Sequence, residues 1–104
     1  MYMNLLKETI KILEENNKTV KDVLWIGTSE SKINWSEFEI LGDFNYDSGF
    51  GGAIINSDLI VRGKGFWLER HEYDGSEWWE FKTLPKTSKR NGELKLKNDH
   101  WYDD

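Results

Sequence analysis

The chain has 104 residues, of which 19 are acidic and 14 basic, with six Trp, one Pro and no Cys. This length predicts one domain around one core, and the lack of Cys excludes disulfides, Cys-based zinc sites and thiol nucleophiles. No apolar run approaches the roughly 18 residues that a membrane-spanning helix needs, and the N-terminus has no signal-peptide pattern. A formal charge of −5 argues against a surface devoted to nucleic acid, so we expect a soluble cytoplasmic protein.

The charge is unevenly distributed along the chain. Residues 29–81 carry eleven acidic and four basic side chains, a formal charge of −7. Residues 82–97 carry six basic and one acidic side chain, a charge of +5, and residues 98–104 carry three Asp. The acidic character therefore belongs to the middle of the chain, and most of the compensating basic residues follow it.

Two amphipathic segments predict helices. Apolar residues at helical spacing predict the first over about residues 4–16, with Asn4 as its N-cap. The second is predicted over about residues 35–44, where Asn34 and Glu37 resemble a capping box. We expect the apolar stripe of the first helix to lie in the core.

Four segments predict strands. A short buried strand is predicted over residues 23–26, and an alternating segment rich in β-branched residues predicts another over residues 54–62. Phe66–Tyr73 and Ser76–Leu84 are the predicted strands of a hairpin, because Asp74-Gly75 is a strong signal for a type I′ turn.

Together these elements predict an α+β fold: an N-terminal helix packed on an antiparallel sheet of about four strands, with a short second helix. The predicted domain covers residues 1–85. Residues 86–104 are predicted to form a polar, loosely ordered tail.

The segment Asp-Ser-Gly-Phe-Gly-Gly at residues 47–52 is a predicted loop dense in glycine. A Gly-rich loop that binds phosphate follows a strand, precedes a helix and usually contains Lys. Here a predicted helix precedes the loop, a strand follows it, and Asp47 would repel phosphate. We interpret the loop as a tight connection that lets two chain segments pass closely.

The predicted turn fixes the register of the hairpin and therefore its two faces. One face should cover the core beneath the first helix, with Arg70 stacked on Trp79. That face holds Phe66, Leu68, Arg70, Trp79 and Phe81. The other, open face holds Trp67, Glu69, His71, Tyr73, Trp78, Glu80 and Lys82.

The predicted register places Glu69 opposite Glu80, and like charges across a strand pair are destabilising. Three explanations remain open. A three-residue turn would shift the register and set Glu69 against Trp79; water with Lys82 or His71 would relieve the repulsion; or the face awaits a cationic partner. An acid–base dyad is a fourth reading, which the lack of a predicted pocket disfavours.

The sequence contains no strong catalytic or metal-binding motif. His71 with Glu69 and Glu80 has no recognised metal-ligand spacing, and no Ser lies in a nucleophile elbow. We therefore expect no enzymatic activity, no cofactor and no metal. Base stacking on the open face is disfavoured because its Glu side chains would repel phosphate, so we expect no direct contact with nucleic acid, and none with a membrane.

Three stretches resemble a family of small hypothetical proteins from phages, prophages and mobile elements of low-GC Gram-positive bacteria. They are Trp-Ile-Gly-Thr at residues 25–28 and the segments 43–52 and 67–81, and the resemblance covers about residues 4–86. It implies no activity and no site residues, but it implies a setting. Short acidic phage proteins are often antagonists of host defence, including anti-CRISPR proteins that occupy the DNA-binding surface of a nuclease.

This setting and the acidic, aromatic hairpin lead us to expect a non-enzymatic inhibitor in the host bacterial cytoplasm. It would act as a DNA mimic and occupy the basic groove of a host protein such as a CRISPR-associated nuclease. The alternatives are an immunity protein against a toxic nuclease, a self-associating structural or regulatory phage protein, and a small enzyme; a monomer and a homodimer are both compatible with the sequence. The predicted partner-binding residues are Asp43, Asp47, Trp67, Glu69, Glu72, Tyr73, Glu77, Trp78 and Glu80.

Overall fold

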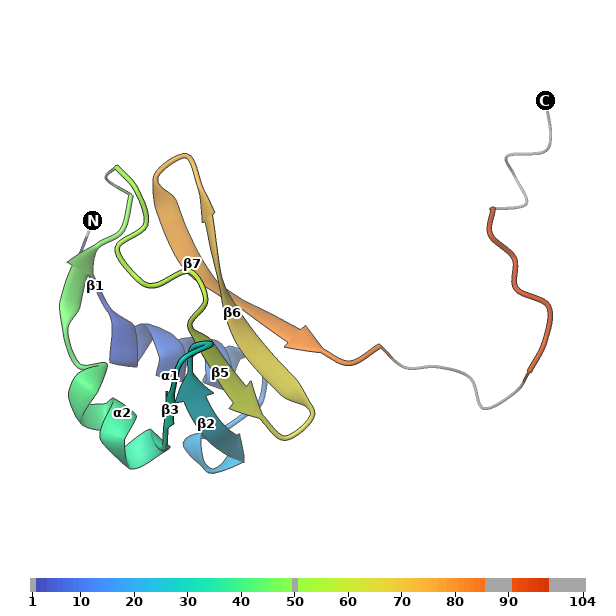
Figure 1. The fold of residues 1–104 in the computed structure, drawn as a ribbon, viewed down its shortest axis with the longest axis horizontal. Coiled ribbons are helices and arrows are strands. Elements are labelled where there is room, and N and C mark those ends of the chain that lie inside the picture. Colours follow the sequence, from blue (N-terminus) through green and yellow to red (C-terminus); the bar gives the residue numbers. More distant parts are fainter. Residues whose placement is uncertain (1, 50, 86–90, 98–104) are drawn as a thin grey trace.

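A five-stranded and a two-stranded antiparallel sheet combine with two α-helices in the computed structural model, which describes residues 2–49, 51–85 and 91–97 (Figure 1). The strand order of the larger sheet is β3-β2-β5-β6-β7, and β1 pairs with β4 in the smaller one. The predicted α+β class is confirmed. The elements are β1 (Tyr2–Asn4), α1 (Leu5–Glu15), the 3₁₀ turn η1 (Val20–Asp22), β2 (Val23–Gly27), β3 (Lys32–Ile33), α2 (Trp35–Leu41), β4 (Asn45–Asp47), β5 (Ile60–Gly63), β6 (Phe66–Tyr73) and β7 (Ser76–Thr83).

The first helix follows its prediction closely. Asn4 is its N-cap, and the Asn4 side-chain oxygen accepts a hydrogen bond from the Lys7 N–H at 3.0 Å. This bond satisfies one of the N–H groups that the start of a helix leaves without an intrahelical partner.

The second helix is shorter than predicted. The Asn34 side chain caps it as expected, but α2 ends at Leu41 rather than at residue 44. The N–H of Gly42 closes the last turn on the Phe38 carbonyl at 2.7 Å, and the chain then turns into β4.

The predicted strand over residues 54–62 is mostly wrong, since β5 covers only Ile60–Gly63. The backbone N–H groups of Ile54 and Ile55 donate to the Glu77 carboxylate and not to a neighbouring strand. An Asn56 turn follows, in which the Asn56 side chain accepts from the Asp58 N–H at 3.1 Å. A buried carboxylate has therefore replaced the expected strand pairing.

Three strands were not predicted: β1, β3 and β4. Each has only two or three residues, which is too short for alternation of apolar and polar side chains to be recognised. They exist because β1 and β4, about 40 residues apart in the chain, pair with Met3 opposite Tyr46, and because β3 pairs with β2.

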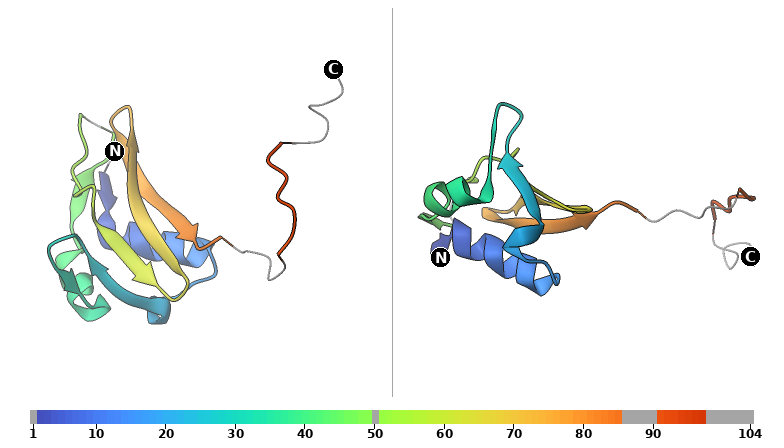
Figure 2. Two further views of the ribbon diagram at one scale, coloured as in Figure 1. Left: turned by 45° about the vertical axis from the view of Figure 1, so that its right-hand side comes forward. Right: turned by 90° about the horizontal axis from the view of Figure 1, so that it is seen from below.

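The core lies between the larger sheet and the two helices. In Figure 2 the helix α1 lies along one face of the β6–β7 hairpin, and the Trp79 indole N–H donates to the Thr9 hydroxyl of α1 at 2.9 Å. The predicted cover of this face by the first helix is confirmed. The buried apolar side chains are Leu5, Leu13, Ile26, Phe38, Tyr46, Ile55, Val61, Phe66, Leu68 and Trp79.

A charged cluster centred on Arg70 completes the core. The Arg70 guanidinium lies 3.0 Å from the Glu77 carboxylate and 3.3 Å from that of Glu8, and 4.8 Å from the Trp79 ring centroid, so the predicted stacking on Trp79 is confirmed. Tyr46 donates to Glu8 and accepts from Arg70. Burial, together with the bond to Glu8, raises the pKa of Tyr46 to about 12.

Residues 91–97 form neither helix nor strand, and Leu94 and Leu96 are exposed. The remainder of the predicted tail, residues 86–90 and 98–104, lies outside the described residues. No helix in the described part of the chain is long and apolar enough to cross a membrane.

Candidate functional site

The β6–β7 hairpin has the predicted turn and register. Asp74 and Gly75 have φ angles of +51° and +85°, as a type I′ turn requires, and Tyr73 lies opposite Ser76. Glu69 therefore lies opposite Glu80, and the alternative register that would set Glu69 against Trp79 is wrong.

Four side chains contact the carboxylates of the Glu69–Glu80 pair. The Trp67 indole N–H donates to Glu69 at 2.7 Å, and the Trp78 indole N–H donates to Glu80 at 3.2 Å. The two ring nitrogens of His71 lie 2.6 Å from Glu69 and 3.6 Å from Glu80, and Lys82 lies 3.2 Å from Glu80. Lys82 and His71 contact the pair as the second explanation predicts, and the two indoles are further partners. The carboxylates and the side chains that contact them are Trp67, Glu69, His71, Trp78, Glu80 and Lys82.

These bonds set the ionisation of both carboxylates. The indole bond from Trp67, followed by the bond to His71, holds the pKa of Glu69 below its ordinary value. The indole bond from Trp78, followed by the bond to Lys82, lowers the pKa of Glu80 in the same way. Neither carboxyl therefore has the raised pKa that a general acid needs at neutral pH.

The two Trp–Glu bonds repeat one arrangement on antiparallel strands. In each, a Trp donates to the Glu two residues further along the same strand, so both partners lie on the same face. Each bond restrains the orientation of its indole, and both rings stay half-buried at the surface. The result is a pair of positioned aromatic rings on either side of a central pair of carboxylates.

The aromatic surface extends beyond the hairpin across the sheet. Strand pairing places Trp25 of β2 opposite Arg62 of β5, Arg62 opposite Trp67, and Trp67 opposite Lys82. The ammonium of Lys32 lies 5.8 Å from the Trp25 ring centroid and adds a further cation at the β3 edge. The open face predicted for the hairpin therefore continues over β5, β2 and β3, and from here on the name covers the whole surface. Its members are Trp25, Lys32, Ile60, Arg62, Trp67, Glu69, His71, Tyr73, Trp78, Glu80 and Lys82.

The open face is less acidic than the hairpin alone suggests. Glu69 and Glu80 are its carboxylates, whereas Lys32, Arg62 and Lys82 are its fixed cations. Sequence reasoning missed Trp25 and Arg62 because the partner of each strand depends on the strand order of the sheet. The available signal for Arg62 was its place between the buried Val61 and Gly63. Trp25 offered a weaker signal, because Ile26 on one side is buried but Leu24 on the other is exposed.

The remaining predicted site residues lie in three different places. Glu72 and Tyr73 are exposed near the hairpin turn, where Tyr73 is 77% exposed. Asp43 accepts from the Asn4 side chain at 2.9 Å, and Asp47 ends β4, so both belong to the smaller sheet and its approach. Glu77 is 5% exposed and is part of the charged core, so the prediction that it faces a partner does not fit its position.

The glycine-rich loop lies beside the hairpin turn. A Cβ atom on Gly75 would stand 3.1 Å from the Gly51 carbonyl oxygen, and the Ser48 hydroxyl donates to the Glu77 carbonyl at 3.0 Å. The interpretation of this loop as a close passage of two chain segments is confirmed. The exposed Glu72 and Tyr73 therefore project from a turn that the loop supports.

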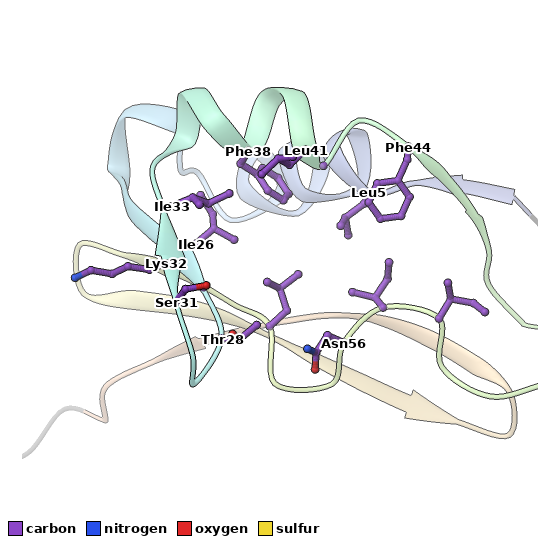
Figure 3. Close-up of a pocket in the computed structure, with 15 residues that line it drawn as sticks. Leu5, Ile26, Thr28, Ser31, Lys32, Ile33, Phe38, Leu41, Phe44 and Asn56 are labelled. Carbon is purple, nitrogen blue, oxygen red and sulfur yellow. The ribbon is translucent and has the colours of Figure 1, made fainter.

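An apolar cleft of about 320 Å³ lies between α2 and the segment 54–59 (Figure 3). Leu5, Phe38 and Phe44 line one wall, Ile26 and Ile33 line the floor, and the segment 54–59 closes the other side. Its lining contains no Asp, Glu, His or Cys, so the cleft has apolar character without a carboxylate or imidazole for acid–base chemistry.

Within residues 2–49, 51–85 and 91–97, no group of three or more His, Asp or Glu side chains is arranged to hold a metal ion. Comparisons of the chain with protein-family models, with curated proteins and with solved structures found no match. The resemblance to small phage proteins stays a prediction. The open face and the acidic hairpin turn are the features from which a function is inferred.

Proposed function

We propose that the protein is a non-catalytic inhibitor that binds another protein through the open face. Its partner is a basic, nucleic-acid-binding groove of a host defence protein, in the first instance a CRISPR-associated nuclease. The observation that carries this proposal is the pair of Trp side chains, Trp67 and Trp78, each held at the surface by a hydrogen bond to a neighbouring Glu.

Such an arrangement suits protein recognition for energetic reasons. Trp is one of the residue types enriched at the energetically important centres of protein interfaces, and its contribution grows when the ring is already oriented before binding. The bonds to Glu69 and Glu80 supply this orientation. The exposed Tyr73 adds a third aromatic ring at one end of the face.

The charge that favours a basic partner lies around the open face, since the face itself carries two carboxylates and three fixed cations. Residues 29–81 carry a formal charge of −7, and the exposed acids Glu72 and Asp74 stand at the hairpin turn, at one end of the open face. Charges at the rim of an interface accelerate association with an oppositely charged surface. Their attraction weakens as the salt concentration rises. We therefore assign long-range steering to these acids and contact area to the rings.

The experiment is a competition assay with a set of purified CRISPR-associated nucleases, in which DNA binding and cleavage are measured over a range of salt concentrations. The wild-type protein should inhibit a member of the set, and its affinity should fall steeply with salt. The Glu69→Lys/Glu80→Lys variant should abolish inhibition, whereas Glu69→Gln/Glu80→Gln should retain most of it because an amide oxygen still accepts the indole bonds.

A matched control separates the open face from net charge. Glu14→Lys/Glu15→Lys changes the total charge by the same amount on the exposed end of α1, away from the open face. It should inhibit like the wild type. Undiminished inhibition by Glu69→Lys/Glu80→Lys, or an equal loss in the α1 control, would contradict the assignment of the open face.

The mixed charge of the open face favours one second candidate, the binding of single-stranded nucleic acid. The row Trp25, Arg62, Trp67, Lys82 alternates aromatic rings with cations across four strands. Surfaces that stack bases use this combination of aromatic rings and phosphate-binding cations. The two Glu side chains within the face oppose it, and for this reason it stands second.

Titration with single-stranded oligonucleotides, followed by Trp fluorescence, distinguishes the two candidates. If the face stacks bases, fluorescence is quenched, and Arg62→Ala/Lys82→Ala removes the quenching while Lys7→Ala/Lys11→Ala on α1 does not. If the face binds a basic protein, oligonucleotides leave the fluorescence unchanged.

A further inference from the structure

The β7 strand lies at one end of the five-stranded sheet and has β6 as its only neighbour in the described part of the chain. The type I′ turn makes Tyr73 and Ser76 a hydrogen-bonded pair, and hydrogen-bonded pairs then recur at every second residue. The even-numbered residues of β7 therefore bond to β6. The odd-numbered residues direct their N–H and C=O groups away from β6, toward the free edge.

Two features mark the ends of this free edge. At one end, the Ser48 hydroxyl donates to the Glu77 carbonyl at 3.0 Å, so the outward groups of Glu77 are occupied. At the other end stands Pro85, which has no backbone N–H. Between them, the outward N–H and C=O groups of Trp79, Phe81 and Thr83 have no hydrogen-bond partner within residues 2–49, 51–85 and 91–97.

We propose that a second copy of the chain binds this edge, with the two β7 strands antiparallel and Phe81 opposite Phe81 of the second copy. A free edge strand of this kind pairs readily with another strand, and a two-fold axis makes the contact self-complementary. In this register Trp79 lies opposite Thr83 of the second copy. All three pairs of outward backbone groups are then hydrogen-bonded.

Side-chain chemistry supports the same register. Glu80 lies opposite Lys82 of the second copy, and the symmetry repeats this opposite-charge pair on the other side of the axis. Leu84, which is 62% exposed, continues the even-numbered series of β7 and lies opposite Trp78 of the second copy. An exposed apolar side chain is thereby covered by a half-buried indole.

The neighbouring registers fail for stated reasons. One shift sets Glu80 against Glu80 of the second copy, and the opposite shift sets Lys82 against Lys82 and places Pro85 opposite Trp79. A register centred on Trp79 requires the outward groups of Glu77, which Ser48 already occupies. The register centred on Phe81 is the one that uses the whole free edge without a like-charge pair.

The dimer would join two five-stranded sheets into one and place the two open faces side by side. Sedimentation equilibrium of the full chain over a concentration series tests it. The mass should rise from 12.3 kDa toward twice that value as concentration increases. A wild-type mass of 12.3 kDa at every concentration would overturn the proposal, and would leave the edge to an extended segment of another protein.

The Thr83→Pro variant isolates the edge. The Thr83 N–H points away from β6, so proline removes a hydrogen bond to the second copy and none within the chain. It should sediment as a monomer with an unchanged circular dichroism spectrum. Thr83→Ala loses the same side chain but keeps the N–H, and it should dimerise like the wild type.

Charge reversal tests the register independently of the proline. Lys82→Glu and Glu80→Lys each place like charges opposite one another twice per dimer and should raise the dimer dissociation constant about tenfold or more. The Glu80→Lys/Lys82→Glu double variant restores opposite charges and should recover dimerisation. A dimer that resists Thr83→Pro and both single reversals would show that the copies associate elsewhere.

Discussion

At the scale of single residues, Glu77 is the side chain whose role the fold changes most. It lies opposite Glu72 in the hairpin, yet Glu77 is buried against Arg70 whereas Glu72 is exposed. Two backbone N–H groups, from Ile54 and Ile55, also end on the Glu77 carboxylate. Glu77 is thus a structural residue of the core, whereas Glu72, directly opposite it in the hairpin, is accessible to a binding partner.

Glu77→Gln is therefore expected to destabilise the protein by about 3 kcal/mol. Removing one member of a buried ion pair is strongly destabilising, and here it leaves the buried Arg70 guanidinium with Glu8 as its remaining carboxylate partner. Urea unfolding followed by Trp fluorescence gives the free energy of unfolding. The control is Glu72→Gln, which should change it by less than about 0.5 kcal/mol. Equal effects of the two substitutions would show that the Arg70 cluster contributes no stability.

The two carboxylates of the open face predict a dependence of stability on acid. Their hydrogen bonds lower both pKa values from the ordinary 4.5, so the unfolded state binds protons at a higher pH than the folded state does. The stabilisation that these hydrogen bonds supply is complete above about pH 4.5 and is lost as the pH falls through the lowered pKa values of the folded state. Urea midpoints measured through this acid range should fall less steeply for Glu69→Gln/Glu80→Gln. An identical pH profile for that variant would contradict the role given to the indole bonds.

The sequence carried enough information to place most of the hairpin residues and too little to place Glu77. Asp74-Gly75 sets a local turn, so Trp67, Glu69 and Trp78 follow by counting outward along two strands. The burial of Glu77 depends instead on a loop more than 20 residues earlier in the chain, whose backbone groups seek an acceptor. No local pattern encodes that encounter.

At the scale of elements, the hairpin turn and the glycine-rich loop stabilise one another by close approach. Gly75 requires a positive φ, and it also stands so near Gly51 that a side chain would contact the Gly51 carbonyl. The loop is therefore fixed by a position in the hairpin as well as by its own sequence.

Gly75→Ala should lower the free energy of unfolding by about 1–2 kcal/mol, because the substitution meets both an unfavourable φ and a Cβ contact of 3.1 Å. Thermal and urea unfolding measure the change. Gly52→Ala is the matched control, since Gly52 does not have a positive φ and a Cβ there meets no atom within 4 Å. A loss as large in Gly52→Ala would show that glycine content, not the contact with Gly51, limits stability.

The ends of the elements that have eight residues or more were predicted to within about one residue. The strands of two or three residues were missed, and the predicted strand at 54–62 was mostly wrong. The helix α1 and the strands β6 and β7 each hold enough residues for spacing and end signals to agree. The segment 54–62 has the composition of a strand, but the backbone N–H groups of Ile54 and Ile55 donate to the Glu77 carboxylate instead of to a neighbouring strand. Local propensity was overridden there by a tertiary hydrogen bond.

At the scale of the whole molecule, strand order decides what the open face is. Trp25 and Trp67 are more than 40 residues apart, and they share a row only because β5 lies between β2 and β6. In the described part of the chain, the same order leaves β7 at the edge of the sheet. The outward backbone groups that follow Glu77 in β7, which Ser48 does not contact, are available to pair with a second strand. The open face and the free edge are thus properties of topology, which composition and periodicity do not determine.

The division between domain and tail gives the last prediction. The ten buried apolar residues of the described ranges 2–49, 51–85 and 91–97 lie between Leu5 and Trp79, so a chain that ends at Pro85 keeps all ten and should unfold within about 0.5 kcal/mol of the full chain. Residues 86–104 contain five basic and four acidic side chains, and their removal changes the net charge only from −5 to −6.

The shortened chain should therefore still bind its basic partner, with the same steep dependence on salt, because the acids of residues 29–81 supply the attraction. The competition assay with the nuclease set, run on both chains in parallel, measures this. If the shortened chain keeps its free energy of unfolding but loses inhibition, residues 86–104 make the contact, and the proposed role of the open face is wrong. If both properties survive, recognition resides in the folded domain that the hairpin and its indoles define.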